Sequence, residues 1–111
     1  MRVVNQNMIR LIRERKDGKA SANTEVVNDG DGSHVLLFGK HIATYDHVKR
    51  ELWVSDAGGW RTVTTKDRLN ALLGAFAPAW RIVQKNHDWF VDSLIEDKRT
   101  LSFWTGEEVY S

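Results

Sequence analysis

Residues 64–76, TTKDRLNALLGAF, decide the fold class because they carry the clearest helical pattern in the chain. Their apolar residues recur at i, i+3, i+4 and i+7, which places on one helix face Leu69, Leu72, Leu73 and Phe76. Thr64 followed by Asp67 predicts a capping box at the start, and Pro78 bars continuation of the helix. The apolar face must be buried, so we expect it to pack against neighbouring strands.

Short strands are predicted on both sides of this helix. Turn-forming Asn, Asp and Gly residues separate the candidate strands, at 24–28, 35–38, 42–45, 51–55, 60–63, 81–84, 89–92 and 101–104. A first helix is predicted at 5–16, with Gly18 as its stop signal. The sequence therefore predicts one α+β domain over residues 1–111, with an antiparallel meander of short strands packed against two helices.

Composition excludes several classes of protein. The chain has 111 residues, a net charge of +1 and no cysteine, which rules out disulfides, thiolate metal sites and a uniformly basic surface. The first residues lack the apolar core of a signal peptide, and no stretch is long enough to span a membrane. We therefore expect a cytoplasmic protein with no membrane partner.

Motifs for catalysis or metal binding are missing from the sequence. The four histidines (34, 41, 47 and 87) lack the spacing of a metal site, although His41 and His47 could meet across a hairpin. The segment from Asp29 resembles a calcium loop but has His34 and Lys40 where glycine and glutamate are required. No nucleophile motif or phosphate-binding loop occurs. We expect a protein that is not an enzyme and holds no metal or cofactor.

Charge is segregated along the chain. Residues 1–20 carry a net charge of +4, residues 21–39 carry −3, residues 40–85 carry +4 and residues 86–111 carry −4. The near-zero total therefore hides two basic and two acidic segments.

The second basic segment is interleaved with aromatic residues, a pattern that suits single-stranded nucleic acid because cations neutralise phosphates while rings stack on bases. The predicted nucleic-acid-binding residues are Tyr45, Trp60, Arg61, Lys66, Arg68, Arg81 and Lys85. A competing interpretation is that the tryptophans form the core and the cations only solvate the surface. The exposure of the five tryptophans distinguishes the two.

Parts of the sequence resemble small accessory proteins of tailed bacteriophages. The resemblance rests on an N-terminal helix followed by segments 23–26, 39–43, 58–73 and 84–89, of which the block GGWRTVTTKDRLNALL at 58–73 is the most specific. The family has no settled chemistry. The resemblance implies an accessory or host-interaction role in the cytoplasm of an infected cell.

Three hypotheses follow. The first is a non-enzymatic phage protein that binds single-stranded DNA to regulate phage transcription or replication, as a homo-oligomer that joins several weak patches. The second is a protein-binding inhibitor or modulator of a host enzyme, favoured by the tryptophan excess. The third is a structural subunit whose tryptophan-rich face is buried in a homo-oligomer.

Overall fold

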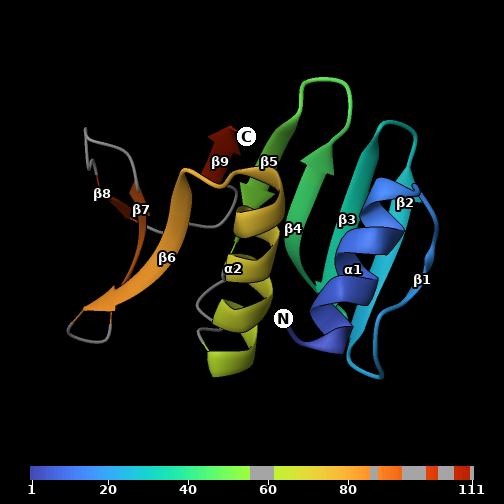
Figure 1. Ribbon diagram of the computed structural model, residues 1–111, viewed down its shortest axis with the longest axis horizontal. Helices are drawn as coiled ribbons and strands as arrows, with labels where there is room; N and C mark the ends of the chain where they lie inside the picture. The colour runs from blue at the N-terminus through green and yellow to red at the C-terminus, as the bar shows by residue number, and fades with distance from the viewer. Residues whose placement is uncertain (56–61, 86–87, 94–99, 103–106, 111) are drawn as a thin grey trace.

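Two helices and nine strands make up the described part of the chain (Figure 1). The computed structural model describes residues 1–55, 62–85, 88–93, 100–102 and 107–110, and the side-chain environments of residues 1–55 and 62–83. In chain order the elements are α1 (Val3–Arg13), β1 (Gly18–Lys19), β2 (Thr24–Asp29), β3 (Gly32–Leu37), β4 (Lys40–Asp46), β5 (Glu51–Val54), α2 (Val63–Phe76), β6 (Trp80–Lys85), β7 (Asp88–Ser93), β8 (Thr100–Ser102) and β9 (Glu107–Tyr110).

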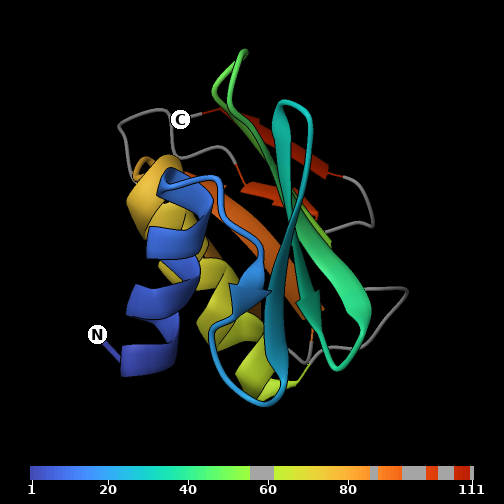
Figure 2. The same cartoon turned by 90° about the vertical axis from the view of Figure 1, so that its right-hand side faces the viewer.

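The strands form two antiparallel sheets. One has six strands in the order β1-β2-β3-β4-β5-β9, and the other has three in the order β6-β7-β8. Both helices cover the same face of the larger sheet (Figure 2). The predicted α+β class, with an antiparallel meander packed on two helices, is confirmed. The expected strand at 60–63 is not: Val63 begins α2, and residues 60 and 61 lie outside the described part.

The core lies between the helices and the inner face of the larger sheet. Strand residues alternate between buried and more exposed positions, and inward residues face each other across the register, as Val26 does with Val35. The largest fully buried side chains are Met8, Ile12, Leu37, Ile42, Leu52, Leu69, Leu72, Leu73, Val26, Val35 and Val54. The apolar stripe predicted on residues 64–76 is therefore the surface by which α2 packs onto the core.

Both helix boundaries differ from those predicted. Helix α1 ends at Arg13 because Arg15 adopts a left-handed φ of 52°, and the N–H groups of Arg15 and Lys16 then donate to the carbonyls of Ile12 and Leu11. Arg15 thus ends the helix, a role that was predicted for Gly18.

Helix α2 begins one residue before the predicted cap. The side chain of Thr62 accepts a hydrogen bond from the Thr65 N–H at 3.1 Å, so Thr62 and not Thr64 is the N-cap. Asp67 is not part of a capping box, because its carboxylate accepts from Arg68 and Asn5 instead.

Tight turns join the central strands. Gly30 and Asp31 alone connect β2 to β3, so residues 29 and 32–34, expected between the strands at 24–28 and 35–38, belong to the strands instead. Phe38 and Gly39 connect β3 to β4 with φ values of 51° and 76°, the backbone of a type I′ hairpin turn. No helix in the described residues has the length and apolar character needed to cross a membrane.

Candidate nucleic-acid interface

The predicted binding residues do not form one cluster in the described structure. Tyr45 lies half-buried on β4, Lys66 is half-buried on α2, and Arg81 is exposed on β6. Trp60 and Arg61 lie outside the described residues, as does the side chain of Lys85. Two of the five tryptophans have a described environment: Trp53 is 39% exposed and Trp80 is half-buried. Neither side chain is fully buried and neither is fully exposed.

Arg68 points into the protein rather than toward a ligand. Only 5% of the residue is exposed, and its guanidinium donates to Asp67 at 2.7 Å, to Thr24 at 3.1 Å and to Asn5 at 3.4 Å. These bonds tie α2 to β2 and α1. A buried guanidinium held by three such bonds supports the fold, so this structure does not offer Arg68 to a phosphate.

Tyr45 belongs to a groove that connects α1, the β4–β5 loop and the end of α2. The groove has a volume of about 490 Å³ and is lined by Arg13, Tyr45, His47, Arg50, Ala75, Phe76 and Pro78. We call it the aromatic–basic groove. The rings of Tyr45 and Phe76 lie 4.5 Å apart between centroids, and His47 meets Tyr45 edge-on at 5.1 Å. Phe76 is buried, so Tyr45, which is half-buried, is the ring of this pair that can offer surface to a planar ligand.

Two arginines from different elements line the same groove. The Arg13 guanidinium carbon lies 5.5 Å from the centroid of the Phe76 ring, within range of a cation–π contact. Arg50 ends the β4–β5 loop with a φ of 57°. The loop is shaped by Asp46, whose carboxylate accepts from the N–H groups of Val48 and Lys49 at 2.9 and 3.0 Å. These backbone bonds lower the pKa of Asp46.

His47 is held in place by β3. Its Nε2 lies 2.7 Å from the hydroxyl of Ser33, which itself donates to Asn28, so Nε2 is the protonated nitrogen of the neutral ring. The backbone N–H of His47 donates to Asp31 at 2.8 Å. Burial and the nearby charge of Arg15 lower the pKa of His47 below its usual value, so the ring is neutral at pH 7.

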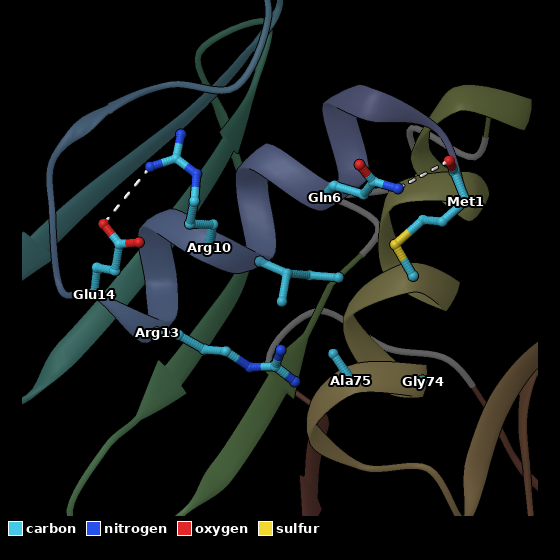
Figure 3. Close-up of a pocket in the computed structure, with 8 residues that line it drawn as sticks. Met1, Gln6, Arg10, Arg13, Glu14, Gly74 and Ala75 are labelled. Atoms are coloured by element: carbon cyan, nitrogen blue, oxygen red, sulfur yellow. Dashed lines mark hydrogen bonds and ion pairs between the residues drawn. The ribbon is translucent and has the colours of Figure 1, made fainter.

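A second cavity continues from the groove along the two helices. It has a volume of about 420 Å³ and is lined by Met1, Gln6, Ile9, Arg10, Arg13, Glu14, Gly74 and Ala75 (Figure 3). The two cavities share Arg13 and Ala75 and therefore adjoin. Arg10 pairs with Glu14 at 3.6 Å, while Figure 3 shows Arg13 reaching toward Ala75 on α2.

Sequence reasoning missed most of this site. Arg13, His47, Arg50 and Phe76 were not among the predicted residues, because no local motif links them. The available signal was the pair of +4 segments at 1–20 and 40–85. The fold brings the end of α1, from the first segment, beside the β4–β5 loop of the second. The possible meeting of His41 with His47 is wrong, since His41 lies beside His34 instead.

Comparison with known proteins places the chain in a family. Residues 1–110 match the family described as Kyanoviridae Gp96 protein, which agrees with the bacteriophage resemblance. Searches of curated proteins and of solved structures gave no significant match. Because the match spans nearly the whole chain, this phage protein belongs to the Kyanoviridae Gp96 family.

Proposed function

We propose that this phage protein binds single-stranded DNA along the aromatic–basic groove and performs no catalysis itself. The observation that carries the proposal is that the Tyr45 ring, packed on Phe76, lines one groove together with Arg13 and Arg50. Stacking of a base on an aromatic ring contributes about 1–3 kcal/mol, and arginines neutralise the flanking phosphates. Rings have no preference among bases, so binding would tolerate many sequences.

The second cavity supports an extended ligand. It leads away from the groove past Arg10 and Arg13, so a strand stacked at Tyr45 could continue along the seam between α1 and α2. Arg81 offers a further exposed cation. It lies near the start of β6, three residues after Pro78, which lines the groove. Trp60, Arg61, Lys66 and Lys85 remain candidates for the same surface.

Few cations serve each groove, so a homo-oligomer that presents several grooves to one strand would raise the affinity by avidity. Action on phage transcription or replication would place the protein in the host cytoplasm.

A titration tests the function. Fluorescently labelled oligo-dT is titrated with the full chain at about 50 mM salt, and the anisotropy is compared with that of a duplex of equal length. Saturable binding that favours the single strand supports the proposal. Absence of binding to oligo-dT at this salt concentration would refute it.

A further inference from the structure

A β-bulge gathers polar side chains on the outer face of the larger sheet, away from the helices. Val35 pairs with Ala43 but Leu36 pairs with His41, so Ile42 is the extra residue of β4. Ile42 and Ala43 are both buried, and His41 and Thr44 consequently emerge on the same side. In a regular strand, residues three apart point to opposite faces. The bulge therefore re-aims His41 toward its neighbours.

Three polar atoms converge at this bulge. His34 on β3 lies directly opposite Thr44, and the Thr44 hydroxyl is 2.8 Å from His34 Nδ1 and 2.6 Å from His41 Nε2. The two imidazole nitrogens are 3.4 Å apart. Two nitrogens at that separation, each about 2.0–2.1 Å from a common ion, subtend about 110° at it, which is the angle of tetrahedral zinc.

Oxygen atoms that could orient metal-bound imidazoles lie near the remaining sides of the two rings. His34 Nε2 lies 3.8 Å from the Asp29 carboxylate, and the backbone of Ala43 lies near the His41 ring. When a metal takes the inward nitrogen of a histidine, a carboxylate or backbone oxygen on the outer side can accept the proton of the other ring nitrogen and orient the ring. Both rings also remain accessible, since the side chain of His34 is 31% exposed and His41 is exposed.

We propose that His34 Nδ1 and His41 Nε2 chelate a divalent transition-metal ion of the zinc class at this bulge. Imidazole nitrogen is a preferred ligand of Zn²⁺, Ni²⁺ and Cu²⁺. No group of three His, Cys, Asp or Glu side chains suited to a metal occurs in the described residues, so protein supplies two ligands and water completes the shell. The Thr44 hydroxyl, which bridges the nitrogens in this structure, occupies the position of the ion, so its side chain would have to rotate away to admit the ion.

Calorimetric titration of the full chain with ZnCl₂ at pH 7.5 tests this site. We expect a one-to-one isotherm that both His34→Gln and His41→Gln abolish. His47→Gln is the matched control, because His47 bonds to Ser33 and lies in the aromatic–basic groove rather than at the bulge. Its isotherm should match that of the parent chain.

Long-range ¹H–¹⁵N spectra of the histidine rings give a second readout that does not depend on stability. Zinc should shift the His34 signal at Nδ1 and the His41 signal at Nε2, and should leave His47 unchanged. An isotherm insensitive to both substitutions, or no zinc-dependent shift at these nitrogens, would overturn the proposal.

Discussion

The guanidinium of Arg13 lies over the ring of Phe76, 5.5 Å from its centroid, and this contact joins the end of α1 to the end of α2. Phe76 in turn lies against Tyr45 on β4. Three elements distant in sequence thus meet in a single stack of a cation and two rings. The stack forms the centre of the aromatic–basic groove, and the proposed function depends on it.

Replacing the ring of Tyr45 should weaken oligonucleotide binding. Tyr45→Leu keeps an apolar side chain in the groove but removes the stacking surface, so we expect a loss of about 1–3 kcal/mol in binding free energy. Anisotropy with labelled oligo-dT measures it. Tyr45→Phe keeps the ring and serves as the control, with affinity close to the parent chain. Equal affinities for all three proteins would exclude Tyr45 as a stacking residue.

Removing the Arg68 guanidinium should destabilise the fold. Arg68→Met leaves Thr24 and Asn5, both buried, without a donor and leaves Asp67 without its 2.7 Å partner. We expect the free energy of unfolding in urea to fall by about 2–4 kcal/mol. The matched substitution of an exposed arginine, Arg81→Met, should change it by less than about 0.5 kcal/mol. Similar stabilities for the two variants would show that the buried network contributes little.

Asparagine in place of Phe38 should stabilise the turn between β3 and β4. Phe38 is 62% exposed and holds a φ of 51° before Gly39, a position where asparagine is preferred. Phe38→Asn should therefore raise the free energy of unfolding by about 0.5–1 kcal/mol, whereas the β-branched Phe38→Val should lower it. Thermal and urea unfolding of the pair measure the difference. Stabilisation by valine would contradict the assigned turn.

Stability should decrease as the pH falls through the range in which His47 titrates. Its pKa is lowered in the folded protein, so the unfolded chain takes up a proton at a higher pH than the folded one does. The stability that depends on the neutral His47 ring is present above the pKa of the unfolded chain, about 6.5, and is lost as the pH falls through the pKa of the folded protein. Urea unfolding between pH 7.5 and 5 should show a smaller decrease for His47→Gln. An identical pH dependence in both proteins would remove His47 as a cause.

Local patterns predicted most of the fold. The stripe from Leu69 to Phe76 and the turn residues near Gly30 and Gly39 located α2 and the central meander, because periodicity and turn chemistry act over a few residues. The exact helix ends were not predictable, since an arginine takes the left-handed position after α1. The bulge at Ile42 also left no local signal, as it depends on the pairing of β3 with β4.

The candidate site was less predictable than the fold. Tyr45 was found because aromatic and basic residues alternate around it, but Arg68 carries the same signal and lies inside the protein. Whether a cation faces solvent depends on tertiary packing, which a linear pattern does not contain. Arg13 and Phe76 could be linked only once α1 and α2 were placed side by side.

The salt dependence of oligo-dT binding tests the central claim most directly, because each phosphate that the protein neutralises steepens the slope of log K against log salt. The variant Arg13→Gln/Arg50→Gln removes the two groove cations, and Arg2→Gln/Lys19→Gln removes two exposed cations outside the groove. We expect the groove variant to bind more weakly and its slope of log K against log salt to shrink by about 1.4, at about 0.7 per phosphate of a single strand. The control should keep the parent slope. Equal slopes in the groove variant and the parent chain would contradict the account.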